Sequence, residues 1–397
     1  MPDSSFSSKR ILSIDAFRAI TMLLMIFVND FWTLSNVPQW LEHQGANVDA
    51  IGFSDIIFPA FLFIVGLSIP FAILARRNKG ESSWVISQHV FIRAMALIIM
   101  GLFMVNFEYI NGASLTLNKY LWEIIMVIGI FLIWIHYKPF NDLGKTKIYL
   151  LQALGVGLLI FLAIIYKGGS SNNVEWMKIH WWGILGLIGW AYLINSIIYL
   201  FLGNRILVLI VAFSIFQALN VLEFTSFDGI PSLRLVVSAS MHSSVCAGML
   251  IGSLILHFKQ LKKENHFLLI LLLFGVVCLI YGFAMRPYWG GFSKIRATPS
   301  WTSVCIGISA LTFLSMYILI DKLKFAGWVN PIKIAGTNTL TCYLLPYLIY
   351  PTLALMSFSL PNHFTNGSIG LIKSMLFALL VVGFTAFLDK IKIKLKV

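Results

Sequence analysis

Polar and ionisable side chains lie at both ends of the first long apolar stretch of the chain. Asp15 and Arg18 are near its start, Asn29 and Asp30 are at its end, and Asp55 opens the next apolar stretch. Charged groups at the ends of membrane helices are costly unless they pair or perform a function. These positions are therefore the first places to look for chemistry.

His43 lies in the short polar segment between these two stretches. The carboxylates of Glu42, Asp49 and Asp55 are near it in sequence and could orient the ring. An imidazole titrates near neutral pH, so a positioned histidine is a candidate general base. A solvated surface histidine is the competing interpretation, and Asp55 could simply cap the start of a helix.

The first apolar stretch has a polar group at each end of one helical face. Asp15, Arg18, Met22 and Asn29 fall within a narrow stripe at 100° per residue. At 1.5 Å per residue the two ends are roughly 21 Å apart, which is most of the ~30 Å thickness of a hydrocarbon core. An ion pair between Asp15 and Arg18, and a bond from Asn29 to another helix, remain structural alternatives.

Further candidates lie on the expected cytosolic side. His89 and Arg93 are one helical turn apart and near Arg76 and Arg77, so the four could bind phosphate groups. The excess of basic residues in cytosolic loops explains them equally well. Asn338 lies inside a later apolar stretch, where its amide could bond a ligand or a neighbouring helix.

One basic segment breaks the expected alternation of charge. Arg286, Lys294 and Arg296 lie in RPYWGGFSKIRATPSW, which the pattern of apolar stretches places on the outside. Either this loop is a tolerated exception to the rule, or it forms a surface for an anionic or polar ligand.

These candidates need elements that can position them, and the composition predicts membrane helices. Hydrophobic residues make up 59% of the 397 residues, charged residues make up only 11%, and the mean hydropathy is +0.87. Runs of about 20 apolar residues recur throughout, as in an all-α, polytopic helical bundle. We predict ten to twelve transmembrane helices. The apolar runs give about twelve spans, at 11–31, 53–75, 84–105, 119–136, 147–166, 179–202, 205–224, 233–258, 266–285, 300–320, 331–356 and 368–388.

The net charge of +13 agrees with this topology. Lys and Arg fall mainly in alternate short loops, so both termini are expected in the cytosol, and no nucleic acid partner is expected. We expect one integral membrane domain over residues 1–397. The four cysteines lie in apolar runs without metal-ligand spacing, so no metal is predicted.

The N-terminal pattern resembles a known family. SIDAFRAITMLLMIFVND, the loop with His43, and GFSDIIFPAFLFIVGLSI are similar to the start of the membrane region of the heparan-α-glucosaminide N-acetyltransferase family. KIRATPSWTS and AGTNTLTCYLL resemble its later signatures. Ala19 stands where the family has Gly, and the loop around His43 is slightly longer. The separate luminal domain of the lysosomal enzyme is not seen, which suggests a relative from the bacterial cytoplasmic membrane.

The resemblance implies an enzyme that binds acetyl-CoA from the cytosol and acetylates an amino sugar of the glucosamine type on the far side. It implies that His43 is the base or acyl carrier, Asp55 its orienting partner and Asn29 a donor to the oxyanion. A homodimer is plausible, and lipids surround the protein. The expected acetyl-CoA ligands are Asp15, Arg18, Arg76, Arg77, His89, Arg93 and Asn338. The expected acceptor ligands are Asp30, Trp40, Glu42, Asn47, Arg286, Lys294 and Arg296.

Two alternative functions stay open. The same base could activate a hydroxyl, giving O-acetylation of a cell-envelope glycan. A secondary transporter of sugars or organic ions is the rival from another class, although the paired repeats and broken helices of many transporters are not evident in the sequence. Direct transfer and an acetyl-histidine intermediate are both compatible with the residues.

Overall fold

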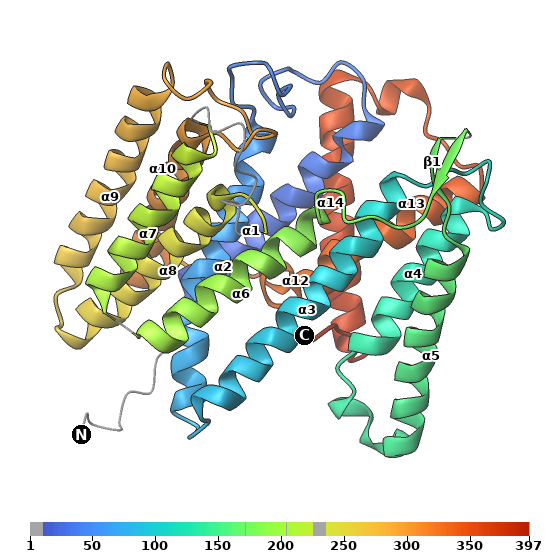
Figure 1. The fold of residues 1–397 in the computed structure, drawn as a ribbon, viewed down its shortest axis with the longest axis horizontal. Coiled ribbons are helices and arrows are strands. Elements are labelled where there is room, and N and C mark those ends of the chain that lie inside the picture. Colours follow the sequence, from blue (N-terminus) through green and yellow to red (C-terminus); the bar gives the residue numbers. More distant parts are fainter. Residues whose placement is uncertain (1–10, 171, 204, 225–235, 397) are drawn as a thin grey trace.

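The protein is an all-α, polytopic membrane bundle, and the prediction of this class is confirmed. A computed structural model describes residues 11–170, 172–203, 205–224 and 236–396 (Figure 1). Within these residues, 9 helices are long and apolar enough to cross a membrane. Two shorter apolar helices in the described part of the chain, Ile206–Leu222 and Thr339–Leu355, bring the number of apolar helices close to the predicted twelve spans.

The helices follow the predicted apolar stretches closely. Two short strands, β1 (Gly168–Ser170) and β2 (Asn173–Glu175), form an antiparallel hairpin between α5 and α6. The helices are α1 (Leu12–Asn29), α2 (Phe53–Arg77), α3 (Ser83–Glu108), α4 (Lys119–Trp134), α5 (Gly144–Ile165), α6 (Gly183–Leu202), α7 (Ile206–Leu222), α8 (Ala239–Gln260), α9 (Glu264–Met285), α10 (Pro299–Met316), α11 (Lys333–Thr337), α12 (Thr339–Leu344), α13 (Pro346–Leu355) and α14 (Gly367–Lys390).

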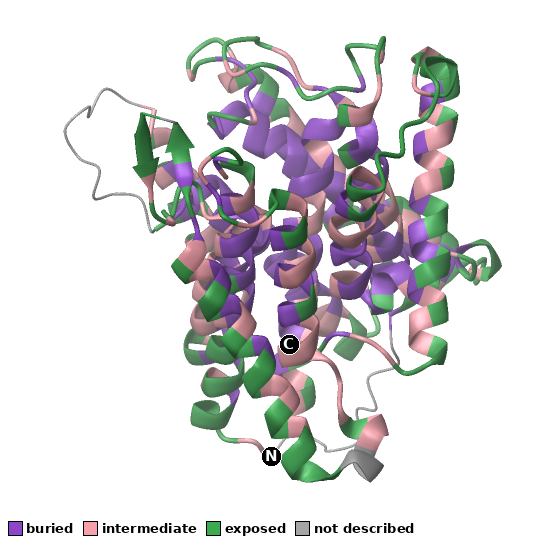
Figure 2. Ribbon diagram, turned by 90° about the vertical axis from the view of Figure 1, so that its right-hand side faces the viewer, coloured by how far each residue is buried: buried purple, intermediate pink, exposed green. Residues whose placement is uncertain are grey.

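The centre of the bundle is α8, which is buried along most of its length. Small residues let it approach α2 closely, since a Cβ on Gly248 would lie 1.9 Å from the carbonyl oxygen of Phe63. Gly66 makes the reciprocal close contact with Val245. Lipid offers little hydrophobic drive for helix association, so such close packing is a main source of stability. Figure 2 shows buried residues concentrated through the middle of the bundle.

The start of α1 is fixed by a side chain from another helix. The N-cap residue, Ile11, has no side chain that can cap the free N–H groups. Instead the carboxylate of Asp321, beyond α10, accepts from the backbone N–H groups of Leu12 and Ser13 at 3.2 and 3.0 Å. This contact satisfies free donors at a helix start and positions Asp15 and Arg18 one turn further on.

The predicted span 331–356 is not one continuous helix, so that expectation is wrong. It is divided into α11, α12 and α13, and Asn338 at the first break has φ −119° and ψ 45°. Gly336 lies against α1, where a Cβ would come within 2.5 Å of the Asp15 carbonyl oxygen. Broken backbone is tolerated at membrane depth where it is buried in protein or lines a cavity.

The bundle has a basic face and, at its opposite end, a loop face. The basic face carries the connections 78–82 and 261–263 and the segment 391–396 after α14. The loop face carries the connections 34–52, 286–298 and 356–366, at the top of Figure 1.

Candidate active site

His43 and Asp55 form a hydrogen-bonded pair on the loop face. The Nδ1 atom of His43 lies 2.8 Å from Oδ1 of Asp55. The other carboxylate oxygen accepts from the backbone N–H groups of Gln44 and Gly52 at 3.1 and 3.0 Å. The Asp55 side chain is 1% exposed and that of His43 is 46% exposed. A buried, fully bonded carboxylate thus holds an accessible imidazole, as one expects of a histidine base and its orienting group.

The start of α2 builds this pair. Asp55 is the third residue of the helix, and its carboxylate reaches back to the N–H of Gly52, the N-cap. Ser54 donates from its hydroxyl to the carbonyl of Leu41 at 2.5 Å, which ties the preceding turn to the helix. A Cβ on Gly52 would lie 1.8 Å from the Glu42 carbonyl oxygen, so only glycine permits this approach. Asp55 therefore caps the helix and also orients His43.

Lys294 comes from a distant part of the chain to the same histidine. Its Nζ atom lies 3.1 Å from Nδ1 and 3.4 Å from Nε2 of His43. Burial lowers the pKa of Lys294, while the nearby Asp55 carboxylate acts in the opposite direction. Three titratable groups from two loops and one helix start thus meet at one point.

Asp49 holds these two loops together. Both of its carboxylate oxygens accept from Nε of Arg286, at 3.0 and 2.9 Å, and the N–H of Phe292 donates to Oδ1 at 2.6 Å. Partial burial acts to raise the pKa of Asp49, but the Phe292 N–H and the Arg286 guanidinium outweigh it and lower that pKa. Ser293 also donates to the carbonyl of Ala46 at 2.9 Å. These contacts bring Lys294 to His43.

Other predicted acceptor residues lie around this pair without a described bond to it. Trp40, Glu42 and Asn47 are exposed on the same loop, and Arg296 donates to the carbonyl of Gly290. Asn29 ends α1 with an exposed side chain. Their roles toward an acceptor stay predictions.

Asp30 has a different environment from the one expected of an acceptor ligand. Its side chain is fully buried, and it accepts from Lys373 Nζ at 2.7 Å, from Ser374 Oγ at 2.5 Å and from the hydroxyl of Tyr350. Lys373 also donates to Thr33 at 2.7 Å. This buried, satisfied ion pair joins the end of α1 to α13 and α14.

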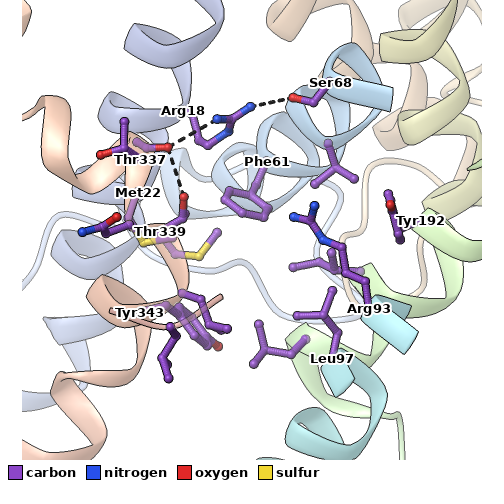
Figure 3. A pocket seen from close by; sticks show the side chains of 18 of the residues that line it. Arg18, Met22, Phe61, Ser68, Arg93, Leu97, Tyr192, Thr337, Thr339 and Tyr343 are labelled. Atoms are coloured by element: carbon purple, nitrogen blue, oxygen red, sulfur yellow. Dashed lines mark hydrogen bonds between the residues drawn. The ribbon is translucent and has the colours of Figure 1, made fainter. Parts of the chain in front are cut away.

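A pocket of about 370 Å³ lies within the bundle, and its lining includes Lys396 from the segment after α14. This volume falls within the range of about 300–1,000 Å³ for small-molecule sites. Arg18 and Arg93 reach into it from α1 and α3, with Phe61 of α2 between them in Figure 3. The broken segment of α11 and α12 forms another wall, which includes Asn338. None of the described residues that line it is acidic.

The two arginines are held in place by defined contacts. Arg18 donates to Ser68 Oγ at 2.6 Å and to the Gly336 carbonyl at 3.3 Å, and it lies 3.4 Å from Asp15. The guanidinium of Arg93 lies 5.2 Å from the ring centroid of Tyr192. Asp15 therefore pairs with Arg18, as the structural alternative proposed, and Arg18 still faces the pocket.

Only part of the predicted phosphate cluster comes together. Arg76 pairs with Glu81 at 2.7 Å, and Arg77 donates to the carbonyl of Leu200 at 2.8 Å. His89 is exposed one turn before Arg93, and none of these three lines the pocket. Asn338 lines the pocket and donates to Asp389 of α14 at 2.8 Å, so the bond to a neighbouring helix is present, and its role toward a ligand stays a prediction.

Several residues that bond to predicted residues or line the pocket were absent from the predictions. Lys373 could have been found, because a lone lysine inside an apolar stretch calls for an acidic partner. Ser68 and Tyr192 carry no comparable signal, since single hydroxyl residues are common in membrane helices. Lys396 lies in a run of alternating lysines that the sequence presents only as a topology signal.

Fold and site together define a multi-spanning membrane protein with a histidine–aspartate pair on one face and a pocket lined by basic side chains within the bundle. Residues 10–180 match the family model described as heparan-alpha-glucosaminide N-acetyltransferase, catalytic. The family resemblance predicted from the sequence is thereby confirmed for this part of the chain, which includes His43, Asp55, Arg18 and Arg93.

Two curated relatives carry the same name. Heparan-alpha-glucosaminide N-acetyltransferase of Homo sapiens is 31% identical over 107 residues, which is 26% of this chain and 15% of the human protein. The Mus musculus protein of that name is 29% identical over 110 residues, 27% of this chain and 15% of its own length. The match therefore covers a small part of each relative.

Proposed function

We propose that this protein is a transmembrane N-acetyltransferase that moves the acetyl group of cytosolic acetyl-CoA to the amino group of a glucosamine-type sugar on the opposite side. The observation that carries the proposal is that α2 joins two complementary sites. It bears Asp55 of the histidine pair at one end and lines the cationic pocket with residues from Phe61 to Ala72. The family match supports the reaction class.

The pocket has the chemistry that the donor requires. Coenzyme A carries phosphates that do not enter hydrocarbon cheaply, so its nucleotide should stay near the basic face. Arginines bind phosphate oxygens through charge-assisted hydrogen bonds, and Arg18 and Arg93 supply them. The deeper lining, which includes Met22, Met25 and Leu97, is apolar and suits the pantetheine arm. The thioester would thus point toward the loop face.

The acetyl group still has a distance to cover beyond this pocket. Phe61 is six residues after Asp55 on α2, which is about 9 Å along the helix axis. Met25 and Phe61 line the pocket on this side. We therefore expect the end of the pantetheine arm to displace these flexible or rotatable side chains when acetyl-CoA binds.

Acetyl transfer needs a base for the amine. With Nδ1–H donating to Asp55, the Nε2 lone pair of His43 can accept a proton. The amine nitrogen attacks the thioester carbonyl carbon, Nε2 takes the amine proton, and the carbon–sulfur bond breaks to release coenzyme A thiolate, which is then protonated. In the alternative path Nε2 attacks first, the thiolate leaves and is protonated, and the amine then takes the acetyl group from the imidazole while its proton passes to the freed Nε2.

The tetrahedral oxygen that forms in either path needs a donor. Lys294 is 3.4 Å from Nε2 of His43, so its ammonium group is well placed to stabilise negative charge next to the reacting nitrogen. Asn29, predicted for this role, ends α1 on the same face. Trp40, Glu42 and Asn47 are exposed beside His43, where an amino sugar could contact them.

Purified protein incubated with labelled acetyl-CoA and glucosamine tests this function. Labelled N-acetylglucosamine is the expected product, and His43→Ala should reduce its rate by about 100-fold or more. His363→Ala is the matched control, because that histidine is exposed on the same face and outside the proposed site. Full activity of His43→Ala would reject the assignment of the base. An alkali-labile product from a glycan acceptor would favour O-acetylation instead.

A secondary transporter has one observation in its favour. The break between α11 and α12 lines the pocket with open backbone, as discontinuous helices do in many transporters. Transport of intact glucosamine into vesicles without acetylation would support that class. The pair of His43 and Asp55, which lies outside this pocket, is better explained by acyl transfer.

The proposed orientation places the basic face in the cytosol, because the basic connections gather there. We propose the bacterial cytoplasmic membrane as the location. A homodimer is a further expectation from the family resemblance, and cross-linking in the membrane would test it.

A further inference from the structure

The segment after α14 folds back against the end of α4 and against α12, and it forms part of the pocket lining. Residues 391–396 begin with a turn in which Lys392 has φ +65°. Leu395 is 8% exposed, and both Leu395 and Lys396 line the pocket that contains Arg18 and Arg93. We call residues 391–396 the strap.

Main-chain hydrogen bonds hold the strap in place. The N–H of Lys396 donates to the carbonyl of Trp134 at 2.9 Å, and the N–H of His136 donates to the carbonyl of Lys394 at 2.8 Å. The N–H of Leu395 donates to Thr341 Oγ1 at 2.9 Å. The strap is thus fastened to the end of α4 and to α12, and none of these bonds uses the Lys396 side chain.

The strap carries three lysines, Lys392, Lys394 and Lys396, and of these Lys396 lines the pocket. Lys394 is paired with Asp389 at 3.3 Å, whereas the structure gives Lys396 no carboxylate within ion-pair distance among the described residues. Burial, and then the charges of Lys396, Lys394 and Lys138, lower the pKa of His136, which shows how basic this rim is.

We infer that the strap is part of the donor site and that Lys396 binds a phosphate group of the coenzyme A nucleotide at the pocket entrance. This inference rests on the proposed use of acetyl-CoA. Lys396 adds a third cation to Arg18 and Arg93 in a pocket whose described lining has no acidic residue. The phosphates are the strongly anionic part of the donor, and the entrance is where they must remain. Arg18 and Arg93 are then available to bind the diphosphate.

A comparison of two donors tests the inference. Acetyl-CoA carries the phosphates, whereas S-acetylpantetheine has the same thioester and arm without them. Lys396→Ala should raise the KM for acetyl-CoA about tenfold with little change in kcat, and it should leave the KM for S-acetylpantetheine unchanged. Lys396→Arg should retain the KM for acetyl-CoA. Lys390→Ala is the matched control, because it removes one exposed positive charge nearby that does not line the pocket.

Direct binding separates a failure of this inference from a failure of the proposed function. If the wild type binds coenzyme A without transferring acetyl groups, the proposed reaction is wrong, and weaker coenzyme A binding by Lys396→Ala still supports the strap. Equal effects of Lys396→Ala on both donors, or no effect on either, would overturn the inference. Failure of the wild type to bind coenzyme A would overturn it as well.

Discussion

At the residue scale, the proposed chemistry depends on the bonds around one carboxylate. Asp55 uses one oxygen for His43 and the other for two backbone N–H groups, and it is almost fully buried. A carboxylate in this position can hold the imidazole in one tautomer and stabilise its protonated form during catalysis. Its short separation from His43 in sequence made the pair predictable.

Asp55→Asn should reduce the acetylation rate by about 100-fold or more while the protein remains folded. The amide can donate a hydrogen bond to Nδ1, which favours the wrong tautomer, whereas its oxygen can still accept from the backbone. Steady-state rates with acetyl-CoA and glucosamine would measure the effect. A rate within about threefold of the wild type would show that Asp55 acts only as a helix cap.

The contact of Lys294 with His43 could not be predicted from sequence patterns. The sequence places Lys294 on the outer side and suggests a ligand surface, but its contact with His43 spans 251 positions. That contact depends on how two loops dock, and loop docking is not encoded in a local period or motif. Lys373 is the opposite case, because a charge inside an apolar stretch indicates a partner even though it does not identify Asp30.

At the scale of elements, the connections 34–52 and 286–298 act as one unit fastened at Asp49. Gly291 contributes through its backbone, since it has φ +72° and a Cβ there would lie 2.5 Å from the Asp49 carboxyl carbon. The left-handed conformation and the close approach both favour glycine. The position of Lys294 follows from this docking.

Asp49→Asn should loosen the two loops and lower activity about tenfold, because the ion pair with Arg286 is lost. Because the pKa of Asp49 is lowered in the folded protein, ionised Asp49 stabilises loop docking fully at pH values above its ordinary pKa of 3.8. This contribution is lost as the pH falls through the lower pKa of the folded state. Pepsin cleavage of the loops as a function of pH would measure it, and Asp49→Asn should remove this pH dependence.

Glu175→Gln is the control for this prediction, because Glu175 pairs with Lys178 in the β hairpin at 2.6 Å. It should leave both the cleavage and the activity unchanged. If Asp49→Asn were cleaved like the wild type and kept its full activity, Asp49 would not fasten the loops.

The helix boundaries were predictable because apolar length reports directly on membrane thickness. The stretch predicted over 53–75 is the helix Phe53–Arg77, and the one predicted over 368–388 is Gly367–Lys390. The break at Asn338 was missed because the surrounding residues stay apolar enough to span. The cause of the break is tertiary, since Gly336 packs against α1 and Asn338 bonds Asp389 of α14.

At the scale of the whole molecule, the bundle positions two distant sites through close helix packing. α2 carries residues of both sites and is held against the buried helix α8 by Gly66 and Gly248. Any change in the spacing of these helices should therefore alter the pocket and the histidine pair together.

Gly248→Ala should destabilise the protein by about 1–3 kcal/mol, because the added methyl group would overlap the Phe63 carbonyl and separate α2 from α8. Thermal unfolding in detergent would measure the loss. Gly383→Ala is the matched control, because a Cβ on this helical glycine meets no atom within 4 Å. Equal unfolding temperatures for the two variants would contradict the packing account.

The most direct test of the central claim is transfer across a sealed vesicle. Vesicles with the basic face inward would hold acetyl-CoA labelled in the acetyl group, and unlabelled glucosamine would be supplied outside. We predict labelled N-acetylglucosamine outside, at a rate that falls about 100-fold or more in His43→Ala. Entry of intact glucosamine without any labelled product would contradict the account.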